Sequence, residues 1–128
     1  MSRDDPLVRL KHMRDAARRV LELIEGRSRE DLDSDDVLAS TIQLKIIIIG
    51  EAANALPQEA LDRAPNVPWR QIIGMRHVLV HEYDLVRMDI MWETATADMP
   101  NLLEELERLI AETEAEREET ADRPQEDR

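Results

Sequence analysis

The stretch VLASTIQLKIIIIGEAANAL, residues 37–56, decides the fold class of this 128-residue chain. Its centre, the isoleucines at 46–49, is β-branched and apolar on every side, a composition that also occurs in buried strands. Helix-forming residues flank this run and no turn signal interrupts it, so we predict one helix that opens at Asp33 or Ser34 and ends near Leu56. A helix that is apolar all round must be covered on more than one side. A single small domain has few other elements with which to cover such a helix, so we predict a homodimer with this helix near the interface.

Two shorter helices are predicted before and after this stretch. The first begins at Asp4 or Asp5, has a proline in its first turn, and stops at Gly26. Its apolar residues recur at a spacing of three to four, which is typical of an amphipathic helix. The second is predicted over residues 68–80, after a link in which prolines bracket a short helical turn.

The chain ends in a long helix, predicted over residues 89–116. Pro100 inside it removes a backbone hydrogen bond and clashes with the carbonyl four residues earlier, so we expect a kink near Thr96. Residues 117–128 lack apolar content and are expected to form a disordered acidic C-terminal tail. The prediction is therefore one all-α domain over residues 1–116, built as a bundle of four or five helices.

Composition excludes several classes of protein. There is no cysteine, so neither a disulfide framework nor a thiolate metal site is possible. The N-terminal residues are charged where a signal peptide needs an apolar stretch, and no segment approaches the roughly 18 apolar residues that span a bilayer. We therefore expect a cytoplasmic protein with no membrane association.

The acidic charge of the chain is unevenly distributed. The formal net charge of −12 argues against a broad basic surface for nucleic acid. Residues 104–128 carry 11 acidic and four basic side chains, whereas residues 57–88 carry four of each together with two of the three histidines. A local phosphate site built from a few arginines and histidines is therefore compatible with the sequence in that middle segment.

The candidate chemistry lies in residues 76–83, which read RHVLVHEY. His77 and His81 are four residues apart and share one face if the helix continues that far. Arg76 and His81 are five apart, which places them about 140° apart around an ideal helix. They converge only if the helix ends or tightens near His81, or if a second protomer brings its own copy across.

An arginine and a histidine together suit the cleavage of RNA. The guanidinium of arginine grips phosphate through two parallel hydrogen bonds, and histidine exchanges a proton near pH 7. Tyr83 can orient a substrate, stack on a base, or accept a transferred group through its hydroxyl. A metal site at His77, His81 and Glu82 is disfavoured because no third ligand follows at a predictable spacing. Each residue alone also has an ordinary interpretation as a surface, capping or packing side chain.

Three blocks of sequence resemble HEPN-domain toxins of the HepT type. Arg76, His81 and Tyr83 fit the R-x4-H-x-Y signature of that family. Residues 49–53 resemble its IGEAA segment, and residues 67–76 resemble its PW-x-x-I-x-GMR segment. With further matches in the last predicted helix, the resemblance covers most of the ordered chain, roughly residues 5–112.

The resemblance implies both an activity and a partner. It implies a HEPN-like homodimer in which two motifs face each other across a cleft, with metal-independent ribonuclease activity and no cofactor. It also implies a toxin whose cognate antitoxin, a minimal nucleotidyltransferase (MNT), neutralises it by transferring AMP to the motif tyrosine. By position, Arg76 and His81 are then the catalytic pair and Tyr83 is the AMP acceptor. Tyr83 and His77, which stands where the family usually has a small polar residue, are supporting residues.

Two other functions fit the same residues. The chain can be a non-catalytic helical dimer that binds a nucleotide or partners a nucleotidyltransferase, or a structural dimer in which the Arg/His cluster is incidental. Two glycines also need an explanation, because glycine inside a helix costs about 1 kcal/mol relative to alanine. For Gly50 and Gly74 the favoured interpretation is close approach between helices, and the alternative is access of backbone or substrate to the site.

Overall fold

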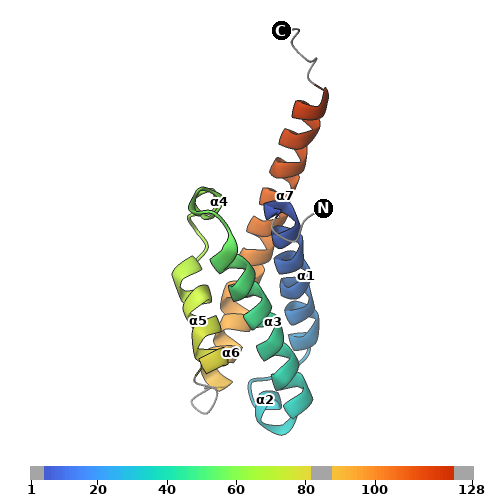
Figure 1. The fold of residues 1–128 in the computed structure, drawn as a ribbon. Coiled ribbons are helices and arrows are strands. Elements are labelled where there is room, and N and C mark those ends of the chain that lie inside the picture. The colour runs from blue at the N-terminus through green and yellow to red at the C-terminus, as the bar shows by residue number, and fades with distance from the viewer. Residues whose placement is uncertain (1–4, 82–87, 123–128) are drawn as a thin grey trace, which may run out of the picture.

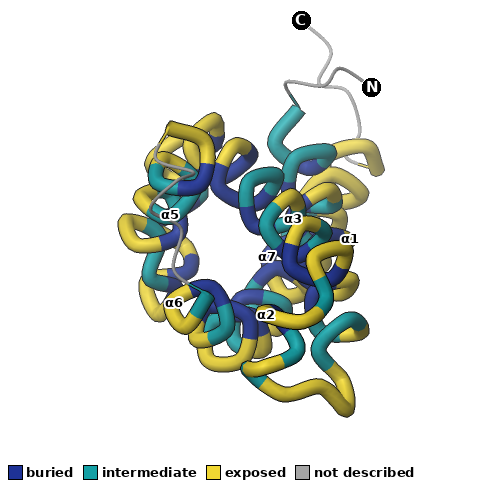
Figure 2. The backbone as a smooth tube through the Cα atoms, turned by 90° about the horizontal axis from the view of Figure 1, so that it is seen from below, coloured by how far each residue is buried: buried dark blue, intermediate teal, exposed yellow. Residues whose placement is uncertain are grey.

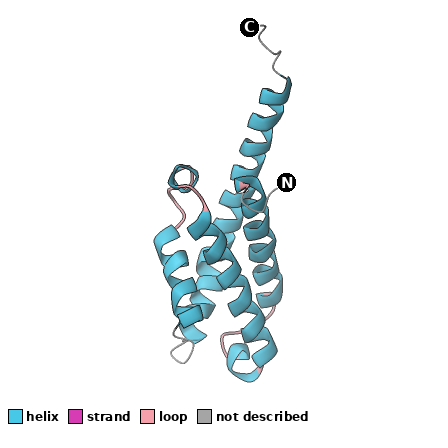
Figure 3. Ribbon diagram, viewed as in Figure 1, coloured by secondary structure: helices cyan, strands magenta, loops and turns pink. Residues whose placement is uncertain are grey.

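A computed structural model describes residues 5–81 and 88–122, and these ranges contain helices but no strand. The elements, in chain order, are α1 (Pro6–Ile24), α2 (Asp31–Ser34), α3 (Asp36–Ala55), α4 (Gln58–Asp62), α5 (Trp69–His81), α6 (Met88–Glu93), the π-helical segment η2 (Thr94–Asp98) and α7 (Met99–Asp122) (Figures 1 and 3). The predicted all-α class is confirmed. None of the helices in the described ranges is both long enough and apolar enough to cross a membrane.

Helix α3 forms the centre of the bundle. It packs against α1 on one side and α5 on the other, and α7 packs against α1. Ile46 and Ile49 are almost fully buried, while Ile47 and Ile48 are partly buried. Figure 2 shows the buried segments of these helices facing the interior. Neighbouring helices thus cover the isoleucine run on two sides, as a helix that is apolar all round requires.

Side-chain caps define where the first and third helices begin. Asp5 caps α1, since its Oδ1 accepts a hydrogen bond of 2.9 Å from the backbone N–H of Leu7. For α3 the predicted caps, Asp33 and Ser34, are wrong. Both belong to the short helix α2, and the cap is Asp35, whose Oδ1 accepts a hydrogen bond of 3.1 Å from the N–H of Leu38. Asp35 has the extended backbone that a capping residue needs.

The predicted kink near Thr96 coincides with a change of helix type. Residues 94–98 form a π-helical segment, in which the N–H of Met99 bonds the carbonyl of Thr94. The next residue, Pro100, has no N–H to offer the carbonyl of Thr96. The disruption therefore lies where the sequence predicts it, and it takes the form of a wider helical turn between α6 and α7.

The C-terminal helix is longer than predicted. Helix α7 continues to Asp122, so residues 117–122, which the sequence assigned to a disordered tail, are helical, and the tail boundary at residue 117 is too early. Its far end projects beyond the other helices (Figure 1). Arg117 explains part of this order, because its guanidinium forms an ion pair with Asp5 at the start of α1. Residues 123–128 lie outside the described ranges.

The Asp5–Arg117 pair predicts a dependence of stability on pH. Hydrogen bonds from Arg117 are the largest cause that lowers the pKa of Asp5 from 3.8 to about 2. A carboxyl group with a lowered pKa in the folded state contributes stability above its unfolded pKa and loses this contribution as the pH falls through the folded value. We expect Asp5→Asn to lower the thermal midpoint at pH 7, with the difference from wild type shrinking below about pH 4. Asparagine caps a helix as well as aspartate does, so this variant keeps an acceptor for the N–H of Leu7 and removes the carboxylate charge that pairs with Arg117. An unchanged difference down to pH 2.5 would contradict the assignment.

Candidate active site

The candidate site lies on the last two turns of α5, where this helix packs against α3. Ile72 and Leu79 are the buried residues of α5 and hold it against the bundle. Helix α5 includes His81, so Arg76, His77 and His81 all lie on one continuous helix. The side chain of Arg76 is 24% exposed, and the two histidines are exposed. The three side chains are thus carried by a firmly packed element and remain accessible.

Gly50 allows α3 and α5 to touch. A Cβ atom placed on Gly50 would lie 3.2 Å from the carbonyl oxygen of Ile72, which is tight, and 2.3 Å from the Cβ of Arg76, which only glycine permits. The predicted close approach between helices is confirmed at this position. At Gly74 it is wrong, because a Cβ there would have no heavy atom within 4 Å among the described residues. Close contact between helices therefore explains the glycine at position 50 but not the glycine at position 74.

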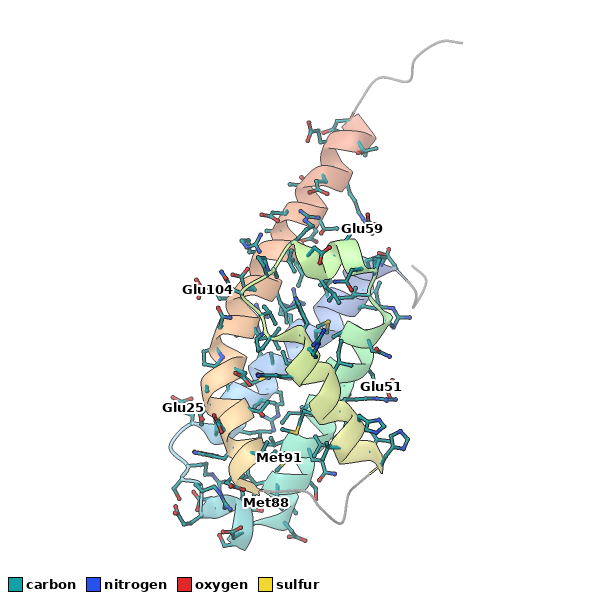
Figure 4. All side chains as sticks on the ribbon, turned by 90° about the vertical axis from the view of Figure 1, so that its left-hand side faces the viewer. Glu25, Glu51, Glu59, Met88, Met91 and Glu104 are labelled. Carbon is teal, nitrogen blue, oxygen red and sulfur yellow. The ribbon has the colours of Figure 1, made fainter. Side chains whose placement is uncertain are left out.

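Glu51, the residue after Gly50, binds the arginine of the motif. Its Oε1 accepts hydrogen bonds from Nη2 of Arg76 at 2.8 Å and from Nε at 3.2 Å. Figure 4 shows Glu51 on α3, beside α5. Sequence reasoning did not identify Glu51 as a site residue and named it only within the segment 49–53. The available signal was a charged residue that directly follows a glycine and the four isoleucines at 46–49.

The two histidines meet as the helical spacing predicts. The ring centroids of His77 and His81 are 4.7 Å apart, and the ring planes are inclined by 45°. Arg76 and His81 are not brought together in the same way. Because the α-helix includes His81, its end does not change the angle of about 140° between the two positions. Within one chain, Arg76 and His81 therefore point to different sides of α5.

Two residues of the predicted sites lie outside the described residues. Tyr83, the expected AMP acceptor, is one of them, as is Glu82 of the alternative metal site. Within residues 5–81 and 88–122, no group of three or more histidine, cysteine or acidic side chains is arranged to hold a metal ion. His77 and His81 thus have no third ligand in that part of the chain.

Large apolar side chains are exposed on the helices that carry the site. Val37 and Leu44 of α3 are 72% and 53% exposed, and Val80 of α5 is 38% exposed. Val37, Leu44 and Glu51 are spaced by seven residues, which is close to two helical turns, so they lie along one face of α3. The exposed apolar residues of α3 therefore lie on the same face as the residue that binds Arg76.

Comparisons with known proteins give a consistent family assignment. The chain matches the family described as "Ribonuclease HepT-like" over residues 13–109. A protein of Caldanaerobacter subterraneus subsp. tengcongensis named "Putative RNase" is 36% identical over 101 residues, which cover 79% of this chain and 90% of that protein. A protein of Thermococcus cleftensis named "Probable ribonuclease HepT" is 34% identical over 93 residues, which cover 70% of this chain and 84% of that protein. No solved structure matches the chain significantly.

Proposed function

This chain belongs to the HepT-like ribonuclease family and is a ribonuclease, and we propose that it is the toxin of a HEPN/MNT toxin–antitoxin pair. The observation that carries the site assignment is the placement of Arg76. Its guanidinium is held by Glu51 at the contact of two helices, one residue before a pair of touching histidine rings. A fixed, partly exposed cation beside groups that exchange protons is what phosphodiester cleavage needs.

The proposed reaction is an in-line transfer that requires no metal ion. The 2′-oxygen of a ribose attacks the adjacent phosphorus, the bond from phosphorus to the 5′-oxygen breaks, and a 2′,3′-cyclic phosphate and a 5′-hydroxyl are formed. His81 exchanges the protons, one leaving the 2′-hydroxyl and one reaching the 5′-oxygen, and His81 of each protomer can supply one of these roles. Arg76 stabilises the charge that develops on the phosphate oxygens.

The same reaction argues for a homodimer. Arg76 and His81 of one chain point to different sides of α5, so a second copy completes the set. The exposed apolar residues Val37, Leu44 and Val80 lie along the helices that carry the site, and burying them removes apolar surface from water. We therefore place the second copy on this face, with the two motifs opposite each other.

Inhibition by AMPylation has a physical rationale in this arrangement. Tyr83 follows His81 by two residues. A phosphate attached to its hydroxyl would add negative charge within reach of the Arg76 guanidinium, and the nucleotide would occupy the RNA groove. In this proposal the cognate MNT-type nucleotidyltransferase transfers AMP from ATP to Tyr83, with release of pyrophosphate, in the cytoplasm.

One experiment tests the proposed function. The purified protein is incubated with total RNA or tRNA in excess EDTA, beside the same protein co-expressed with the proposed MNT-type nucleotidyltransferase. We expect cleavage by the protein alone, and an AMP-sized gain of intact mass together with loss of cleavage in the co-expressed sample. If neither sample cleaves and no mass changes, the toxin function is contradicted, and a non-catalytic dimer that binds a nucleotide becomes the better account.

The dimer face has its own test, Leu44→Asp. A charge at position 44, which lies between Val37 and Glu51 on this face of α3, leaves the monomer fold intact because Leu44 is 53% exposed, but it opposes burial in an interface. We expect the dissociation constant of the dimer to rise at least about 30-fold, as for an interface residue that contributes about 2 kcal/mol to binding. RNA cleavage should fall as the dimer is lost. Sedimentation over a concentration series measures this, with Ala111→Asp on the exposed side of α7 as the charge-matched control. If Leu44→Asp dimerises as strongly as wild type, this face of α3 is not the dimer interface.

A further inference from the structure

The ion pair between Glu51 and Arg76 has a specific geometry. A single carboxylate oxygen, Oε1, accepts from both Nε at 3.2 Å and Nη2 at 2.8 Å. These bonds occupy one edge of the planar guanidinium, whose five N–H groups are fixed relative to one another. The other edge, formed by Nη1 and the second hydrogen of Nη2, has no partner among the described residues. That edge can grip a phosphate through two parallel hydrogen bonds.

The base of the arginine side chain is also held. Gly50 lets the Cβ of Arg76 lie directly against the backbone of α3, so the side chain leaves α5 at the helix contact. Beyond Cβ, however, the arginine has a long flexible chain, and its side chain is 24% exposed. Among the described residues, Glu51 alone forms hydrogen bonds with its charged end. The orientation of the guanidinium therefore depends on Glu51.

The carboxylate also has a cost for substrate binding. Glu51 is 54% exposed, and a negative charge so close to Arg76 repels the phosphate that the arginine is meant to bind. A partly exposed ion pair contributes only modestly to stability, and stability gives no reason for the carboxylate to lie beside this arginine in particular. Orientation of a catalytic group before the reaction does explain it, because a pre-organised donor needs no reordering in the transition state.

We infer that Glu51 is a positioning residue, which holds the guanidinium of Arg76 so that its free edge faces the scissile phosphate. This inference rests on the proposed role of Arg76 in RNA cleavage. It adds a residue of α3 to a site whose described motif residues, Arg76 and His81, both lie on α5. The neighbouring residues Gly50 and Glu51 then act together. Gly50 leaves space for the Cβ of Arg76, and Glu51 orients its guanidinium.

The test compares two substitutions that separate orientation from charge. Glu51→Ala removes the acceptor, and we expect kcat to fall about 10- to 100-fold, with KM unchanged or lower because the repulsion is gone. Glu51→Gln keeps an acceptor oxygen without the charge, so it should retain most of kcat and also show the lower KM. Glu107→Gln, whose wild-type carboxylate pairs with Arg18 at 3.3 Å, is the charge-matched control and should behave as wild type. The double variant Glu51→Ala, Arg76→Ala should be no slower than Arg76→Ala alone.

A second measurement does not depend on cleavage. The Nε–H resonance of Arg76 is followed by ¹⁵N relaxation in the free protein, and we expect it to be ordered in wild type and Glu51→Gln and mobile in Glu51→Ala. Equal order in all three proteins, or an unchanged kcat in Glu51→Ala, would overturn the positioning role. A higher kcat in Glu51→Ala than in wild type would also overturn the positioning role, and it would identify the ion pair between Glu51 and Arg76 as inhibitory. If wild type does not cleave RNA at all, the proposed function fails, and the relaxation data still decide whether Glu51 orders Arg76.

Discussion

Replacing His81 with alanine should lower the rate of RNA cleavage by about 10²–10⁴-fold, the contribution of a well-placed proton-transfer group. Arg76→Ala should lower it by about 10²–10³-fold, as expected when one donor to the developing phosphate charge is removed. Rates are measured with a defined RNA in EDTA. His81 is the last residue of α5 and is exposed, and Arg76→Ala keeps the Cβ that lies against Gly50, so neither change should unfold the protein.

Two further variants make this prediction specific. Arg76→Lys keeps the positive charge but loses the planar fork of donors, so it should recover little of the lost activity. His77→Ala removes the ring that contacts His81 at 4.7 Å between centroids, and as a supporting residue it should lower the rate less than His81→Ala does. Circular dichroism and sedimentation confirm that each variant is folded and has the wild-type assembly. If Arg76→Ala and His81→Ala both cut as fast as wild type, the assignment of the site is wrong.

Gly50→Ala should destabilise the fold, by about 1–3 kcal/mol of unfolding free energy, because the bundle is overpacked at this point. The added methyl group would lie 2.3 Å from the Cβ of Arg76, an atom fixed close to the backbone, so α5 as a whole must move away from α3. The same movement displaces Arg76 from Glu51, and cleavage should fall as well. Equilibrium unfolding in urea at several protein concentrations measures the stability and separates it from dimer dissociation.

Gly74→Ala is the matched control on the neighbouring helix. A Cβ at Gly74 has no heavy atom of the described chain within 4 Å, so alanine should raise the unfolding free energy by about 0.5–1 kcal/mol through its better helix propensity. If Gly50→Ala is as stable as wild type, the close contact between α3 and α5 is wrong. A loss of stability in Gly74→Ala, confined to concentrations at which the protein is dimeric, would place the second copy against this part of α5.

Local patterns in the sequence determined the helices and much of the candidate site. The isoleucines at 46–49 form a helix because their neighbours are helix formers, and a helical segment can be read from nearby residues alone. Asp5 was identified as a possible cap, and the disturbance before Pro100 was located, since both depend on bonds within one or two turns. The contact of His77 with His81 follows from a spacing of four residues on a helix.

Only the tertiary structure decided which residues meet across helices. Gly50 and Gly74 have the same local cost, yet only Gly50 lies at a helix contact. Glu51 and Arg76 are 25 positions apart and form an ion pair because α3 packs on α5. Asp5 and Arg117, 112 positions apart, pair because α1 packs on α7, and Arg117 lies in the part of α7 that composition alone assigned to a tail. Propensity and periodicity describe interactions within a few residues, whereas these contacts exist only after distant helices have packed together.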